Sequence, residues 1–266
     1  MTDLLTPETL PALATRIERA QAAQNAACAR ASARGVPPLS IAGGEVIFAG
    51  PGSPLTQAVA LALGQEITAA ELDQVEALLG REPGPMQIET CPFTHPSLLA
   101  LLAERGYRIS EFQQVLVRPV EPLESAPSGL EVRPLRPGEE EPWARGIFEA
   151  FTDSVPQDPA LLQLMLPATR AEGTTCFIAL IDGEPAGGGT VAVHDGIATL
   201  SGAGVKRAFR RRGLQTALVR ARLDFAARQG CTVASSGTQP GTTSQHNLER
   251  LGFRIAYPKV VLVRER

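Results

Sequence analysis

Cysteine and histidine are scarce in this sequence and lie far apart. The 266 residues include four cysteines and three histidines, and none of them forms the closely spaced Cys/His pairs that hold metal ions in proteins. We therefore expect no metal site. The cysteines are Cys28, Cys91, Cys176 and Cys231, and we interpret them as reduced, buried thiols of a cytoplasmic protein.

Long apolar runs and a basic excess are also missing. No segment holds the ~18 consecutive apolar residues that a membrane-spanning helix needs, and residues 1–5 lack the basic and then apolar order of a signal peptide. The 25 Lys and Arg against 28 Asp and Glu give a net charge of -3. This balance argues against a protein that coats nucleic acid or an anionic membrane. Apolar residues make up 44% of the chain, which is enough to bury a sizeable core.

An internal repeat indicates that the chain has two related halves. Residues 106–118 read GYRISEFQQVLVR and residues 252–264 read GFRIAYPKVVLVR, with seven identical positions. Residues 119–129 hold three prolines and a glycine, which is typical of a linker. We predict two domains, at 1–122 and 128–266. A chance likeness between two helix–glycine–strand units is the alternative.

Periodicity and turn signals predict mixed α and β elements in both halves. For the first half we expect helices at 7–34, 58–63, 68–79 and 96–105, with a capping box at Thr68 and Glu71, and strands at 45–49, 86–89 and 109–118. For the second half we expect strands at 174–181, 186–193, 197–205, 231–235 and 255–264. Helices are expected there at 140–151, 159–170, 214–229 and 244–251.

The residues that indicate chemistry lie at 205–218, between a strand and an amphipathic helix. The N–H groups of the first turn of a helix lack partners within the helix, and the helix dipole adds positive charge there. Gly213 lets the backbone turn sharply and approach an anion, while Arg210, Arg211 and Arg212 add formal charge. The pattern predicts a pyrophosphate site. A solvated basic loop is one alternative; a nucleic-acid patch is disfavoured because interleaved aromatic residues are missing.

This segment resembles the pyrophosphate-binding motif of the GNAT superfamily of acyl-CoA N-acyltransferases. In that motif a Val ends a strand, and Arg/Gln-x-x-Gly-x-Gly/Ala opens a helix. Val205, Arg210 and Gly213 match it, whereas Gln215 stands where a second Gly or Ala is usual. The resemblance covers about residues 130–266 and includes the helix-to-strand ending at Gly252.

The resemblance implies a mixed α/β fold of two GNAT-like domains, each a mostly antiparallel central sheet flanked by helices. The first would be a degenerate copy without the cofactor motif, structural or helping to shape the acceptor site. Acetyl-CoA would be the co-substrate, without a metal, and its acetyl group would pass directly to a primary amine of a small molecule or peptide. The expected cofactor-binding residues are Ala203, Gly204, Val205, Arg210, Arg211, Arg212, Gly213, Leu214, Gln215, Thr216 and Asn247.

The sequence does not identify the catalytic acid and base. Many relatives use a Tyr four residues before the Gly of the Gly-Phe pair, and that position is Leu248 here. The strand at 197–205 carries no carboxylate for the usual Glu base. Glu149, Asp153, Ser244 and His246 are polar candidates, yet each also suits a solvated helix face or a helix cap. A water relay, or a non-catalytic acyl-CoA-binding or interaction protein, remains the alternative. Neither the acceptor nor the oligomeric state is readable.

Overall fold

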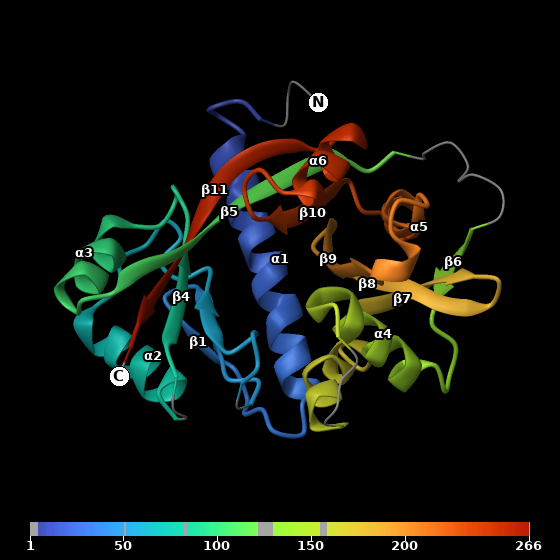
Figure 1. The fold of residues 1–266 in the computed structure, drawn as a ribbon. Helices are drawn as coiled ribbons and strands as arrows, with labels where there is room; N and C mark the ends of the chain where they lie inside the picture. The colour runs from blue at the N-terminus through green and yellow to red at the C-terminus, as the bar shows by residue number, and fades with distance from the viewer. Residues whose placement is uncertain (1–4, 51, 82–83, 122–129, 155–158, 266) are drawn as a thin grey trace.

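The computed structural model describes residues 5–50, 52–81, 84–121, 130–154 and 159–265. Over these ranges the chain forms one sheet of eleven strands in the order β1-β2-β3-β4-β11-β5-β10-β9-β8-β7-β6, flanked by helices (Figure 1). The predicted mixed α/β fold with a mostly antiparallel sheet is confirmed. Of the linker predicted at 119–129, Pro119 is the last residue of β5, and residues 122–129 lie outside the described residues.

The first half begins with the long helix α1. Its elements are α1 (Leu10–Ala31), β1 (Leu39–Ile41), β2 (Gly44–Ile47), β3 (Gln57–Val59), α2 (Ala69–Leu79), β4 (Met86–Thr90), α3 (Pro96–Glu104) and β5 (Arg108–Pro119). The capping box of α2 is confirmed, because the Thr68 hydroxyl accepts from the Glu71 N–H at 3.3 Å and the Glu71 carboxylate accepts from the Thr68 N–H at 2.8 Å.

One predicted helix of the first half is wrong. Residues 58–63 fall on β3 and the turn after it, where Ala60 and Ala62 have φ of 57° and 55°. A short apolar run does not distinguish a buried strand from a buried helix by periodicity, and residues 58–62 of this run are buried, with Leu63 partly so.

The second half contains most of the antiparallel sheet. Its elements are β6 (Glu131–Pro134), α4 (Glu140–Thr152), β7 (Thr174–Ile181), β8 (Glu184–His194), β9 (Ile197–Val205), α5 (Leu214–Arg228), β10 (Val233–Thr238), α6 (Thr243–Arg250) and β11 (Arg254–Arg264). The helix expected over 159–170 is instead two 3-10 helices, Pro159–Leu164 and Leu166–Thr169.

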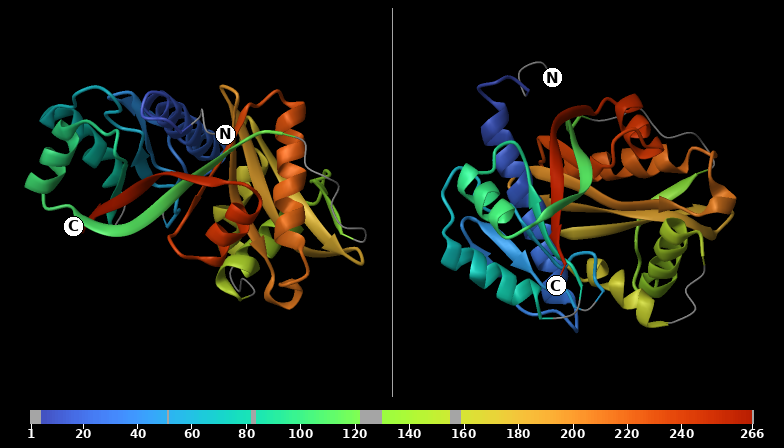
Figure 2. Two further views of the ribbon diagram at one scale, coloured as in Figure 1. Left: turned by 90° about the horizontal axis from the view of Figure 1, so that it is seen from above. Right: turned by 60° about the vertical axis from the view of Figure 1, so that its left-hand side comes forward.

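The final strand of each half completes the sheet of the other half. β5 pairs antiparallel with β10, β11 pairs antiparallel with β4, and β5 and β11 pair with each other between them (Figure 2). Leu116 of β5 therefore packs in the core of the second half, and Leu262 of β11 packs against the core of the first.

The pairing of β5 with β11 is symmetric about its centre. Each residue of β5 corresponds to the residue of β11 that lies 146 positions later in the sequence, as Arg108 corresponds to Arg254. Arg254 pairs with Val117, and the corresponding residues, Arg108 and Val263, also pair with each other. At the centre, Gln113 pairs with its own counterpart, Lys259. Outside these strands, β3–β4 and β9–β10 are both parallel pairs. An approximate two-fold axis thus relates the two halves.

Helix α1 lies across this central region and joins the halves (Figure 1). Its Leu13 and Ile17 share a buried cluster with Val115 of β5 and Tyr257 of β11. At the turn between β8 and β9, the Asp195 carboxylate accepts from Arg16 of α1 at 3.2 Å. α1 therefore forms one wall of any space enclosed between the halves.

Candidate active site

Strands β9 and β10 run side by side for three residue pairs and then separate. Residues 233–235 pair in parallel with 197–199, after which β10 follows β5 and β9 follows β8. The Ser236 hydroxyl donates to the Leu200 carbonyl at 2.9 Å where the strands part. Beyond residues 199 and 235 the two strands therefore splay apart.

Strand β9 also bulges at this gap. Gly188 pairs with Gly204 and Thr190 pairs with Ser201, which leaves Gly202 and Ala203 opposite a single residue of β8. Gly202 has a φ of 55°, a conformation that favours glycine. A bulge re-aims backbone groups out of the ladder, and backbone N–H groups facing a reaction centre polarise a carbonyl.

A cavity of about 590 Å³ lies at the N-terminus of α5. Gly213 precedes this helix with a φ of 82°, and no side chain of the described residues caps it. The first N–H groups of α5 are therefore left for another partner. Of the predicted cofactor-binding residues, Arg212 does not line the cavity. Those that do are Ala203, Gly204, Val205, Arg210, Arg211, Gly213, Leu214, Gln215, Thr216 and Asn247.

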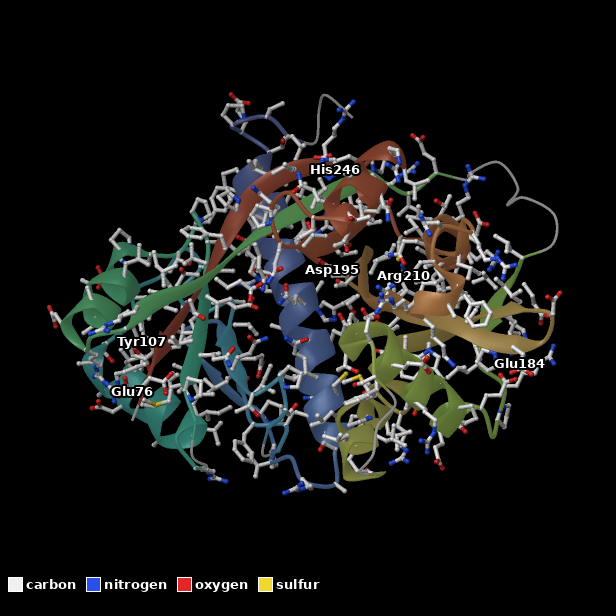
Figure 3. The ribbon with its side chains drawn as sticks, in the orientation of Figure 1. Glu76, Tyr107, Glu184, Asp195, Arg210 and His246 are labelled. Atoms are coloured by element: carbon white, nitrogen blue, oxygen red, sulfur yellow. The ribbon has the colours of Figure 1, made fainter. Side chains whose placement is uncertain are left out.

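Arg210 holds the basic loop against α4 (Figure 3). Its guanidinium donates to the Val205 carbonyl at 3.1 Å, to the Ala150 carbonyl at 3.2 Å and to the Asp153 carboxylate at 2.5 Å. Lys206 in the same loop pairs with Glu149 at 3.3 Å. Glu149 and Asp153 are thus engaged with cations of the loop, and neither lines a cavity beside it.

A second cavity of about 340 Å³ adjoins the first and shares Phe151, Ala203, Gln215 and Ser244 with it. It lies between the halves, because its lining comes from α1, β3, β4 and β5 as well as β9, β10, α5 and α6. Apart from Leu55, the residues that the first half contributes are polar: Gln21, Gln24, Asn25, Gln57, Glu89 and Gln113. Such a row of amides and a carboxylate makes the wall strongly polar.

A buried charge cluster lies behind this wall. The Lys259 ammonium pairs with Glu18 at 2.9 Å and with Glu89, and it donates to the Gln21 amide oxygen at 2.9 Å. Burial opposes the charge on Lys259, but the carboxylates of Glu18 and Glu89 outweigh it and raise the pKa of Lys259. The Tyr257 hydroxyl donates to Glu18 at 2.8 Å, and burial, followed by the Glu18 charge, raises the pKa of Tyr257 far above its usual value.

The other positions considered for the catalytic acid and base are Leu248, His246 and Ser244. Leu248, which stands at the usual Tyr position, is buried and lines the second cavity with an apolar side chain. His246 is exposed, with its Nδ1 2.9 Å from the Thr242 carbonyl, and lines neither cavity. The Asn247 side chain accepts from Arg250. Tyr107 bonds Glu76, far from Arg210 (Figure 3). Of the candidates beside the cofactor loop, Ser244 faces both cavities.

The sequence analysis missed the first-half wall of the second cavity. Gln21, Gln24 and Asn25 lie at spacings of three and four residues on α1, so a polar stripe on this Ala-rich helix was the available signal. Glu89 and Lys259 lie on strands distant in sequence, and nothing local marks them as partners.

Metal-binding clusters and helices that could span a membrane are both absent from the described residues. Within those ranges no group of three or more His, Cys, Asp and Glu side chains gathers to hold a metal ion, and no helix is long and apolar enough to cross a membrane. All four cysteines are buried and unpaired. Burial raises the pKa of the Cys28 thiol to about 11 and that of Cys176 to about 12.

Known proteins share both sequence features and the fold of this chain. Residues 139–253 match the model of the acetyltransferase (GNAT) family. A GCN5-related N-acetyltransferase from Kribbella flavida shares the fold with a TM-score of 0.64 at 19% identity, over 94% of this chain and 95% of that one. A tandem GNAT protein from the clavulanic acid biosynthesis pathway gives 0.60 at 16% identity, over 84% and 78%. No curated protein matches the sequence.

Proposed function

We propose that the chain transfers the acetyl group of acetyl-CoA to a primary amine, starting from the match of residues 139–253 to the acetyltransferase (GNAT) family. The observation that supports the proposal most is the cavity at the uncapped start of α5, which adjoins the splay between β9 and β10. Its lining gives a pyrophosphate backbone N–H donors and the nearby arginine charge.

The two cavities suit the two ends of such a cofactor. The pyrophosphate fits the first cavity beside Gly213 and Thr216, and the thioester end fits the splay beside Ala203, which lines both cavities. The bulged backbone of β9 would then polarise the thioester carbonyl. Attack by the amine forms the C–N bond, breaks the C–S bond and releases the thiol of coenzyme A.

Replacing Gly213 tests the cofactor site. Gly213→Val places a branched side chain at φ 82° beside the N–H groups that would bind phosphate, so we expect acetyl-CoA affinity to fall at least ~10-fold, measured by calorimetry. Gly183→Val is the matched control, because Gly183 has the same φ of 82° in the hairpin between β7 and β8. Equal acetyl-CoA affinities in the two variants would contradict the proposed site.

We assign cofactor binding to residues 128–266 and a supporting role to residues 1–122. The first-half segment that corresponds to the basic loop by topology is 60–68, between β3 and α2, and it contains no Lys or Arg. There the His95 N–H donates to the Ala62 carbonyl at 2.8 Å, and Leu63 bridges to Thr94. These contacts tie the end of β3 to the end of β4, where the second half has an open splay.

A non-catalytic acyl-CoA-binding protein is the second candidate, and the apolar Leu248 is the observation that favours it. The two functions differ in thiol release. An enzyme releases coenzyme A from acetyl-CoA faster when an amine is added, whereas a binding protein shows acetyl-CoA affinity and no amine-dependent release.

A further inference from the structure

Resting on the proposed function, we infer that the 340 Å³ cavity between the halves is the acceptor site. It takes a small polar amine in its ammonium form, and the Glu89 carboxylate of the first half receives that ammonium. The second half thus holds the cofactor, while the first half chooses the acceptor.

Charge balance is the first support. Glu18 and Glu89 are both at least 95% buried and share the single ammonium of Lys259, so the cluster retains one uncompensated negative charge. Each carboxylate also accepts one neutral hydrogen bond, Glu18 from Tyr257 at 2.8 Å and Glu89 from the Gln21 amide at 3.1 Å. Of the two, Glu89 lines the cavity and Glu18 does not. A buried charge is stable when it is paired, so a cation entering the cavity finds its partner at Glu89.

A buried hydroxyl without a partner is the second, independent support. Thr199 lines the cavity, and its hydroxyl has no hydrogen-bond partner among the described residues. Asn25 and Gln57, each more than nine-tenths buried, add two amides to the same lining. Buried polar groups without partners cost free energy, so this wall is suited to a ligand that carries its own hydrogen-bonding groups.

Arg222 of α5 lines the same cavity. It is fully buried, and it donates to the carbonyls of Leu218 at 3.0 Å, Thr190 at 3.1 Å and Ser201 at 3.3 Å. Burial lowers the pKa of Arg222 to about 10, which keeps it charged at neutral pH. A ligand that carries both an ammonium and hydroxyl oxygens offers partners to Glu89 and to Arg222.

The link between the walls places the amine near the cofactor. Gln24 of α1 donates to the Ser201 hydroxyl at 2.7 Å, next to the bulge at Gly202 and Ala203 that lines the same cavity. An amine held by Glu89 therefore shares one space with the backbone that faces the thioester.

The test is a matched panel of amines with acetyl-CoA in excess. Glucosamine and ethanolamine represent polar amines, phenethylamine and cyclohexylamine represent apolar ones, and thiol release measures turnover. We expect the polar pair to be acetylated. Glu89→Gln should raise the KM for the better polar amine about 10–100-fold, as expected for loss of a hydrogen bond to a charged group, with acetyl-CoA affinity unchanged.

Glu76→Gln is the matched control. Glu76 is an ion-paired carboxylate of the first half, bonded to Arg105 and Arg264 and distant from the cofactor loop (Figure 3). Its loss should leave the KM for the amine unchanged. Asn25→Leu and Gln57→Leu remove amides without disturbing the charge cluster, and each should also raise this KM about 10-fold or more, so they decide the question if Glu89→Gln does not fold.

Two outcomes would overturn the inference. They are a wild-type KM for the polar amine in the cavity variants, or acetylation of the apolar amines alone. Acetyl-CoA binding without acetylation of any panel member would instead favour the non-catalytic candidate, and absence of acetyl-CoA binding would contradict the proposed cofactor site, so both results speak against the proposed function.

Discussion

The three consecutive arginines of the cofactor loop have different surroundings. Arg210 reaches back to α4 and ties the loop to the Ala150 carbonyl and Asp153. Arg211 adopts a φ of 63° and lines the first cavity, whereas Arg212 is exposed and does not line it. Sequence alone treats the three as one positive patch, but their roles depend on where the turn before Gly213 directs each side chain.

We expect Arg210→Ala to weaken acetyl-CoA binding more than Arg212→Ala does. Loss of Arg210 frees the loop from α4 as well as removing a charge beside the cavity, so its affinity should fall ~10-fold or more. Arg212 acts only through a solvent-screened charge, for which a change of ~2–3-fold is expected. Calorimetry on both variants at one salt concentration measures the difference, and an equal or larger loss in Arg212→Ala would refute the assignment.

At this scale the basic loop at the start of α5 was predictable, and the first-half wall of the second cavity was not. The loop depends on local features, since Gly213, the basic residues and the start of α5 follow each other in sequence. The wall depends on tertiary contacts between Glu18, Glu89 and Lys259, which come from three distant segments. Leu248 at the usual Tyr position was equally visible from sequence, and the structure adds that it is buried.

At the scale of elements, the repeat predicted a final strand in each half. It did not predict that each final strand, β5 or β11, pairs with the sheet of the other half. Residues 106–118 and 252–264 have the same apolar pattern, so either strand satisfies the same edge of a sheet. The structure pairs each with the partner half. Sequence periodicity reports which face of a strand is buried, and it carries no information on which sheet buries it.

Leu116→Ala tests the exchange. Leu116 belongs to β5 of the first half but is fully buried in the core of the second. The void that the shorter alanine leaves in this core should lower the free energy of unfolding by ~2–5 kcal/mol. Urea unfolding followed by the fluorescence of Trp143 in the second half and by circular dichroism should show the same lower midpoint.

Leu99→Ala is the matched control for this substitution. Leu99 on α3 is 44% exposed, so the same change there should cost less than ~0.5–1 kcal/mol. An unchanged fluorescence midpoint in Leu116→Ala would mean that β5 does not support the second half.

On the scale of the whole molecule, two similar halves carry unlike sites. The second half has the open splay and the basic loop. In the first half the corresponding strand ends are joined through Ala62 and His95, and the corresponding segment holds no cation. The sequence predicted a first half without the cofactor motif, but residues 58–63 were expected to be a helix. The segment that corresponds to the basic loop, 60–68, is therefore identified only by the structure.

One acetyl-CoA should therefore bind per chain. Calorimetric titration of the full chain should give a stoichiometry of one, and Gly213→Val should weaken that single site. Gly64→Val in the corresponding first-half segment, where φ is 73°, should leave both the stoichiometry and the affinity unchanged. Two sites per chain, or full binding in Gly213→Val, would contradict the assignment.

The pair of Lys259 and Gln113 at the approximate two-fold axis has an evolutionary consequence. In a dimer of identical subunits, an axial position meets its own copy, so a lysine there would face a lysine. A single fused polypeptide is free of that constraint. It places one ammonium at the axis, opposite an amide, where Glu18 and Glu89 share it. Joining two copies in one chain thus permits a mutation that symmetry would forbid, and an asymmetric pocket becomes accessible to selection.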